Sequence, residues 1–181
     1  MTSVEPSDPS FQSRSREQRL AELGCEVVSQ APGAYVVATL GPVVVACVGR
    51  DAGAAGLDAF SLANAQVARK HPRMGHLIIF SEGCSLPGVE ERQAVVEVLR
   101  SFQGQIMGAG VVVEGRGLPT VLLRSIVNVV DRISRSAHPA RTFASVADAV
   151  RWLAQTLGGE DVPYAARLEE VAIELRRVLL S

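Results

Sequence analysis

The chain has 181 residues, of which 48% are hydrophobic and 20% charged, and its formal net charge is -1. This composition is typical of one globular domain with a substantial core and some additional segments. The basic residues are spread along the sequence, which excludes the clustered charge of a nucleic-acid-binding protein. Almost all of them are arginine, as in proteins of GC-rich bacterial genomes. Because no positive start precedes an apolar run, we expect no secretory signal peptide and a cytoplasmic location.

The longest apolar stretch, residues 34–49, is interrupted by Gly41 and Pro42. It is also shorter than the roughly 20 apolar residues of a membrane helix, so we interpret it as two strands around a turn. The cysteines form no CxxC pair and have no metal-ligand spacing with the histidines, so we expect no metal and no cofactor. Cys25 and Cys47 lie in apolar surroundings and are predicted to be buried, inert thiols.

The N-terminal third contains a tail, a short helix and three strands. Residues 1–14 are rich in Ser, Pro and charge, which predicts a disordered tail. Residues 15–23 are predicted to form a short helix. Val-rich segments separated by Pro-Gly and Gly-Pro turns then predict strands at 25–30, 35–40 and 43–48.

The middle of the chain alternates between short apolar strands and amphipathic helices. This alternation indicates an α/β sheet with a largely parallel portion. Apolar spacing places Val89 and Leu122 on buried helix faces, and Ser145 is predicted to cap the last core helix. The expected helices span residues 57–71, 89–102, about 119–133 and 146–157, and the expected strands 76–80, 109–113 and 141–143.

The C-terminal segment, residues 159–181, is predicted to be a separate amphipathic helix added to a domain that spans residues 15–158. The apolar residues of this helix form a stripe along one side, and such a stripe must be buried against another apolar surface. One alternative is docking onto the chain's own domain, and the other is a dimer or a partner helix. The residues that would form an oligomer interface are Leu168, Val171, Leu175 and Val178.

The order of elements, the loop after residue 80 and the closing segment with Phe143, Trp152 and Leu153 together resemble the STAS family over residues 35–157. The chain is similar to the anti-sigma-factor antagonist branch and, more closely, to STAS-like bacterial proteins of uncertain function. The resemblance implies a mixed β-sheet with helices packed mainly on one side. It also implies a domain that binds a partner rather than one that catalyses a reaction.

The loop Ser81-Glu82-Gly83-Cys84-Ser85 joins an expected strand to a helix N-terminus, which favours a negative charge. In the antagonist branch, the matching loop has an Asp-Ser-Ser-Gly-like order and carries a phosphorylated Ser. That order is missing here. If the phosphorylation switch is present, Ser81 or Ser85 is its acceptor. The alternative is that both hydroxyls cap the helix or complete the turn.

Cys84 is the best candidate for a catalytic group, because a following helix N-terminus is expected to lower the pKa of its thiol. A phosphatase loop would need an Arg shortly after the Cys, but the first one, Arg92, lies inside the helix. A Cys-His pair would need His71, His76 or His138 to lie nearby in space. An enzyme that uses the Cys84 thiol therefore stays an alternative to the non-enzymatic function that we expect.

Arg116, between Gly115 and Gly117, follows a strand and precedes a helix, so this turn could bind a small anion or be only a tight turn. We expect a non-enzymatic regulatory or scaffolding module in signalling. It would bind a protein partner, or itself, through residues 81–89 and 115–118, and bind no nucleic acid. A second alternative is a small ligand or lipid in an apolar cleft between helix and sheet.

Overall fold

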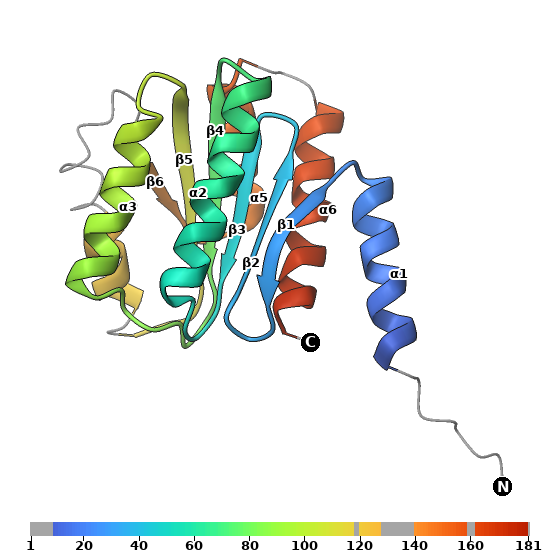
Figure 1. The fold of residues 1–181 in the computed structure, drawn as a ribbon, viewed down its shortest axis with the longest axis horizontal. Coiled ribbons are helices and arrows are strands. Elements are labelled where there is room, and N and C mark those ends of the chain that lie inside the picture. The colour runs from blue at the N-terminus through green and yellow to red at the C-terminus, as the bar shows by residue number, and fades with distance from the viewer. Residues whose placement is uncertain (1–8, 118–119, 128–139, 159–161, 181) are drawn as a thin grey trace, which may run out of the picture.

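The computed structural model describes residues 9–117, 120–127, 140–158 and 162–180. Within these residues, six strands form one mixed sheet in sequence order (Figure 1). The first three strands are antiparallel, and the third to the sixth are parallel to one another. The strands are β1 Glu26–Ala31, β2 Tyr35–Leu40, β3 Val43–Val48, β4 Met74–Phe80, β5 Ile106–Val113 and β6 Ala140–Phe143. The predicted α/β fold with a largely parallel portion is therefore confirmed.

Helices cover both faces of the sheet, which corrects the expectation that they pack mainly on one side. One face carries α2 (Gly53–Lys70), α3 (Val89–Ser101) and the helical residues 120–127. The other face carries α5 (Val146–Thr156) and α6 (Val162–Leu179). Right-handed crossovers between successive parallel strands place their helices on the same face. The opposite face of the sheet is thus left for the two helices that follow β6.

The helix α6 docks on its own domain. Its residues Leu168, Val171 and Leu175 are fully buried, and Val178 is half-buried. They join a single core cluster with side chains of β2, β3 and α5. The Tyr164 hydroxyl also donates a hydrogen bond of 2.8 Å to the Leu40 carbonyl. The residues predicted for an oligomer interface therefore face the chain's own core, and the helix is not a separate unit.

The N-terminal helix α1 (Pro9–Glu22) begins inside the predicted disordered tail, so the expected boundary after residue 14 is wrong. Proline at the first helical position loses no hydrogen bond, because the first N–H groups of a helix have no partner within it. Leu20 is buried in the same core cluster as α6. An ion pair of 2.7 Å between Arg19 and Glu170 joins the two helices. The other predicted tail residues, 1–8, lie outside the described part of the chain.

A row of glycines lets α5 lie close to the sheet. A Cβ atom added at Gly75 would come within 2.8 Å of the Leu153 side chain, and one at Gly108 within 2.9 Å of Trp152. An added Cβ at Gly110 would come within 3.4 Å of Ala149, so β5 approaches α5 closely at this position too. The helices described include none with the length and apolarity needed to cross a membrane.

Candidate functional site

Three loops meet at one edge of the sheet, because parallel strands present their carboxyl ends at the same edge. The loops are residues 49–52 after β3, 81–88 after β4 and 114–117 after β5. Backbone hydrogen bonds tie them in series. The Ser81 N–H donates to the Val48 carbonyl at 2.9 Å, and the Glu114 N–H donates to the Phe80 carbonyl at 2.9 Å. The Ser85 N–H donates to the carbonyl of Arg50 at 3.0 Å. The predicted loops are therefore adjacent.

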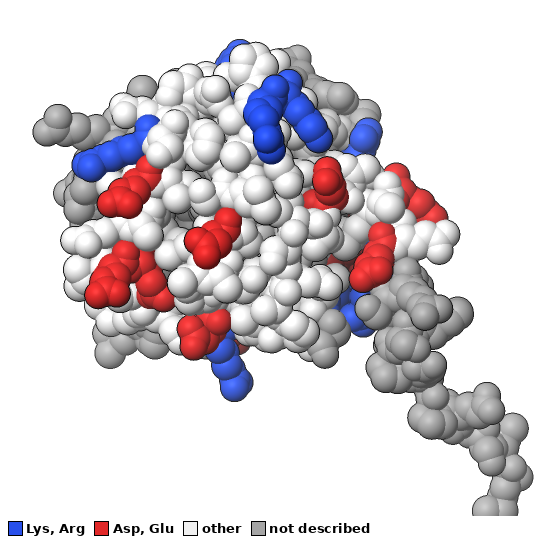
Figure 2. Space-filling model, in the orientation of Figure 1, with Lys and Arg blue, Asp and Glu red and all other residues white. Residues whose placement is uncertain are grey.

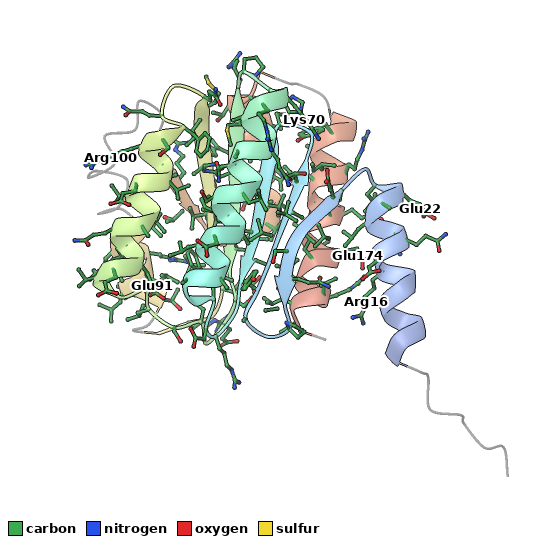
Figure 3. All side chains as sticks on the ribbon, viewed as in Figure 1. Arg16, Glu22, Lys70, Glu91, Arg100 and Glu174 are labelled. Carbon is green, nitrogen blue, oxygen red and sulfur yellow. The ribbon has the colours of Figure 1, made fainter. Side chains whose placement is uncertain are left out.

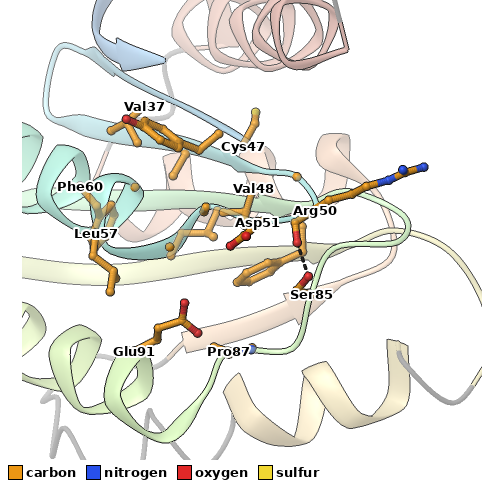
Figure 4. Close-up of a pocket in the computed structure, with 18 of the residues that line it drawn as sticks. Val37, Cys47, Val48, Arg50, Asp51, Leu57, Phe60, Ser85, Pro87 and Glu91 are labelled. Atoms are coloured by element: carbon orange, nitrogen blue, oxygen red, sulfur yellow. Dashed lines mark hydrogen bonds between the residues drawn. The ribbon is translucent and has the colours of Figure 1, made fainter. Parts of the chain in front are cut away.

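A cavity of about 170 Å³ opens at this edge, between the sheet, the start of α2 and the start of α3 (Figure 4). We call it the edge pocket. Its walls are mainly apolar, and its polar rim contains Asp51, Ser85 and Glu91. The apolar side chains of the walls include Tyr35, Val37, Leu57, Phe60, Ile78 and Phe80. A cavity at the carboxyl end of parallel strands is where α/β sheets commonly bind ligands.

Two carboxylates from different elements face the edge pocket. Figure 4 shows the side chains of Asp51 and Glu91 directed into it, whereas the Arg50 side chain extends away. Glu91 is held because one of its oxygens accepts a hydrogen bond of 2.6 Å from the Gly88 N–H, a contact that also caps α3. Among the described residues, no hydrogen bond or ion pair engages the Asp51 carboxylate. The rim therefore carries negative charge without a facing cation.

The predicted serines lie at the junction of the loops. Ser85 lines the edge pocket, and its hydroxyl donates a hydrogen bond to the Arg50 carbonyl. Ser81 is half-buried at the end of β4. The hydroxyl of Ser85 thus completes a loop contact, as one of the two predicted alternatives expects. Phosphorylation stays a prediction, although a phosphate on Ser85 would meet the nearby rim carboxylates and be repelled by them.

The other predicted loop residues lie away from the edge pocket. Glu82 and Gly83 are exposed, and Gly83 adopts a φ of +79°, which favours glycine. The Glu82 side chain packs beside Gly115, where an added Cβ would come within 3.0 Å of it. Arg116 is exposed in the loop after β5. The structure therefore brings Glu82 to the turn that holds Arg116, but it does not place Arg116 in the edge pocket.

Cys84 packs against an apolar cluster that includes Phe80, Val111 and Leu123. Burial raises the pKa of its thiol, whereas the backbone hydrogen bond lowers it by less. The expectation of a lowered pKa is therefore wrong, because desolvation of the thiolate outweighs the favourable backbone contact.

No described histidine can pair with Cys84. His76 lies four residues before Phe80, which at about 3.3 Å per residue is roughly 13 Å from the loop. His71 follows the C-terminal end of α2, at the opposite edge of the sheet. Figure 3 shows this separation on the face that carries α2 and α3. Lys70 lies at the same end of α2 as His71, and Glu91, at the edge pocket, lies at the opposite end of that face. His138 lies outside the described residues.

His76 instead belongs to a buried polar contact beneath α2. Its Nε2 lies 2.7 Å from Oδ1 of Asn64, and the Asn64 amide donates to the Phe60 carbonyl at 2.8 Å. The His76 ring meets Phe60 edge-on, with 5.1 Å between the ring centroids. Burial lowers the pKa of His76 to about 4, so the ring is neutral at physiological pH. Because Phe60 is also a wall of the edge pocket, this buried contact supports that wall.

Two helix faces differ from the sequence prediction at the same edge. Val89 is 62% exposed and Leu122 is 50% exposed, although both were expected to be buried. Leu123 takes the inward position of the helical residues 120–127 and is 2% exposed. The prediction placed the apolar face one residue out of register, because neighbouring leucines give the helix two overlapping apolar stripes. Residues 128–133 of the expected helix lie outside the described part of the chain.

Sequence reasoning missed Asp51 and Glu91 as site residues. In the sequence, Glu91 is interpreted as an acidic residue that stabilises the N-terminus of a helix, and Asp51 is interpreted as a loop residue before α2. A usable signal did exist, since Asp51 follows a wholly apolar strand and precedes a helix, as ligand-binding loops of α/β sheets do. The two carboxylates line the same pocket because β3 and β4 are neighbours in the sheet, and the sequence does not show this neighbourhood.

The fold and site define an α/β domain with a mixed six-stranded sheet, helices on both faces and a pocket at the carboxyl edge of its parallel strands. No protein-family model matches the chain, and no curated protein or solved structure matches it either. The resemblance to the STAS family therefore stays a prediction.

Proposed function

We propose that the chain is a non-enzymatic binding domain and that the edge pocket holds a small, mainly apolar ligand. The observation that carries this proposal is the cavity of about 170 Å³ with apolar walls and a few polar groups at its rim. An apolar cavity of about 150 Å³ is sufficient to bind benzene. The buried part of the ligand therefore has roughly the size of one aromatic ring.

Binding is favoured over catalysis by the state of the cysteine thiols near the edge pocket. Cys47 lines the pocket, but burial raises the pKa of its thiol to about 12. The raised pKa of the Cys84 thiol disfavours the reactive thiolate, and the side chain packs into the core rather than lining the edge pocket. The rigid walls from β2, β3, β4 and α2 suit a preformed pocket. We also propose a cytoplasmic location, which the three free cysteines support.

A pocket-filling variant tests this proposal. Val95 is half-buried and lines the edge pocket from α3, so Val95→Phe should fill the pocket with little change to the sheet. Single-ring compounds screened by saturation-transfer NMR should show contacts with the wild-type chain and lose them in Val95→Phe. The matched control is Gln93→Phe, because Gln93 lies two residues away on the same helix, is exposed and does not line the edge pocket. Equal signals from wild type and Val95→Phe would contradict a ligand in the edge pocket.

A second candidate function is the predicted regulatory or scaffolding contact with a protein partner. The observation that favours it is the exposure of four large apolar side chains close to the loops at the carboxyl edge. Exposed apolar patches of this kind commonly mark interaction surfaces. They are Leu86, Val89, Val121 and Leu122, which we call the apolar rim.

Photo-crosslinking in cells tests the partner proposal. A photoreactive residue in place of Val89 should give one defined protein adduct, and the adduct should weaken when Arg116→Glu is added. The same residue in place of Leu62, which is 49% exposed on α2, serves as the control and should give none. The same adducts from both positions would mean that the apolar rim has no special role.

A further inference from the structure

We propose that the ligand of the edge pocket is an organic amine, with its apolar group between the sheet and α2 and its ammonium group at Asp51 and Glu91. This inference rests on the proposed function and adds the chemical class of the ligand. It follows from the polar groups at the rim, which are acceptors from three different segments. Asp51 comes from the β3–α2 loop, Ser85 from the loop after β4, and Glu91 from the first turn of α3.

The three rim residues Asp51, Ser85 and Glu91 offer side-chain acceptors and no free side-chain donor. One oxygen of Glu91 is used by the Gly88 N–H, which leaves the other for a ligand. The Ser85 hydroxyl donates its proton to the Arg50 carbonyl, so its oxygen can still accept a bond. The Asp51 carboxylate has no described partner. An ammonium group carries three donors and no acceptor, which matches this set of three acceptors.

The local charge favours the same ligand class. Arg50 is the single basic residue of the pocket lining, and its side chain points away from the cavity (Figure 4). The Asp51 carboxylate lies near the first turn of α2, with Oδ1 3.7 Å from a Cβ position built at Gly53. It therefore already offsets the positive end of that helix dipole, which would otherwise attract an anionic ligand.

The surrounding surface extends this pattern. In Figure 2, acidic side chains lie over the middle and lower part of the face formed by α2 and α3, while basic side chains lie mostly toward its margins. The negative potential of these acidic side chains raises the local concentration of cations and speeds their encounter with the edge pocket. A cationic ligand is consequently favoured both at the rim and during its approach.

Three probes that share a phenylethyl group separate the charge of the ligand from its apolar contact. They are 2-phenylethylamine, 2-phenylethanol and 3-phenylpropanoate, titrated calorimetrically into the full chain at low salt. The amine should bind about tenfold or more tightly than the alcohol, and the carboxylate should bind more weakly than both. Added salt should reduce the preference for the amine, because it screens the partly exposed rim charges.

Charge-neutral variants then locate the effect. Asp51→Asn and Glu91→Gln should each lower the affinity for the amine several-fold while leaving the affinity for the alcohol unchanged. Glu91→Gln keeps an amide oxygen for the Gly88 N–H, so the cap of α3 is preserved. The control is Glu90→Gln, because Glu90 is exposed beside Glu91 and does not line the edge pocket.

The outcomes distinguish this inference from the proposed function. Equal affinities for the amine and the alcohol, both lost in Val95→Phe, would overturn the amine inference and leave an apolar ligand in the edge pocket. A preference for the amine that survives both Asp51→Asn and Glu91→Gln would also overturn it. If none of the three probes binds, the single-ring ligand site and the amine inference both fail.

Discussion

His76 is a titratable side chain enclosed between β4 and α2, where protonation would leave a charge without solvent. Its pKa is lowered to about 4 by burial, compared with an ordinary value of about 6.5 in an unfolded chain. Below pH 6.5 the unfolded chain binds a proton that the folded chain does not. The folded state therefore loses stability as the pH falls from about 6.5 to about 4, by roughly 3 kcal/mol from this group.

Urea unfolding between pH 7 and pH 4 measures this contribution. His76→Gln removes the titration and keeps an amide that can bond to Asn64. The wild-type free energy of unfolding should fall more steeply with decreasing pH than that of the variant. The carboxylates titrate in both proteins, so their effect cancels in the comparison. Parallel pH curves would show that His76 is not held neutral by burial.

Cys84 provides a second prediction at the scale of single residues. Because burial raises the pKa of its thiol above the ordinary value, the thiolate is scarce at neutral pH. Alkylation by iodoacetamide should be slower than that of free cysteine at pH 7 and should still be increasing above pH 9. Mass spectrometry of peptides resolves this site from the buried Cys25 and Cys47. Rapid alkylation at pH 7 would instead favour the thiol-enzyme alternative.

At the scale of elements, the contact between α5 and the sheet depends on glycines at three positions of β4 and β5. An added Cβ at Gly108 would approach both Trp152, at 2.9 Å, and Thr156, at 3.0 Å. Trp152 is itself fixed, because it packs on Phe143 with 5.6 Å between ring centroids and lies beneath Arg141. There is little freedom for it to move away from a new methyl group.

Gly108→Ala should therefore destabilise the fold by about 1–3 kcal/mol through overpacking. Gly104→Ala is the matched control, since an added Cβ there would meet nothing within 4 Å. Its effect on the free energy of unfolding should be within about 0.5 kcal/mol of zero or slightly stabilising. Thermal and urea unfolding of the two variants measure the difference. Similar values for both would mean that α5 can shift on the sheet without cost.

The start of α5 shows an element that its local sequence defines well. The Asp148 N–H donates to the Ser145 hydroxyl oxygen at 3.2 Å, and that hydroxyl donates to the Asp148 carboxylate at 2.7 Å. This confirms the predicted cap, which involves only residues three positions apart. By contrast, the sequence predicts that Val89 and Leu122 face the core, and this prediction is wrong because both are exposed. A helix can be recognised from its own periodicity, but its rotation depends on the sheet that it contacts.

At the scale of the whole molecule, α6 completes the core on the face that the crossover helices leave open. Its apolar stripe joins the same cluster as β2, β3 and α5, and Arg176 forms an ion pair of 2.6 Å with Glu114 at the end of β5. A version ending at Gly159 would expose this sheet face to water. We expect it to aggregate or unfold, as light scattering and circular dichroism would show. A folded, soluble monomer would mean that α6 is dispensable for the core.

A pair of substitutions on α6 tests the same point without truncation. Leu175 is fully buried, so Leu175→Ala should lower the free energy of unfolding by about 2–5 kcal/mol. Ile173 is 38% exposed on the same helix, and Ile173→Ala should cost clearly less. Urea unfolding at constant protein concentration gives both values. Equal costs, or a cost that falls with increasing concentration, would favour packing of α6 against a second chain.

The sequence by itself determined the features that depend on neighbours along the chain. Apolar strands at 35–40 and 43–48 and the cap at Ser145 follow from residue type, short spacing and turn chemistry. Only the tertiary structure decided which face each helix covers, because that depends on strand order and crossover handedness. It also decided the edge pocket, since Asp51 and Glu91 are 40 positions apart in the sequence and line the same pocket only because β3 and β4 are neighbours.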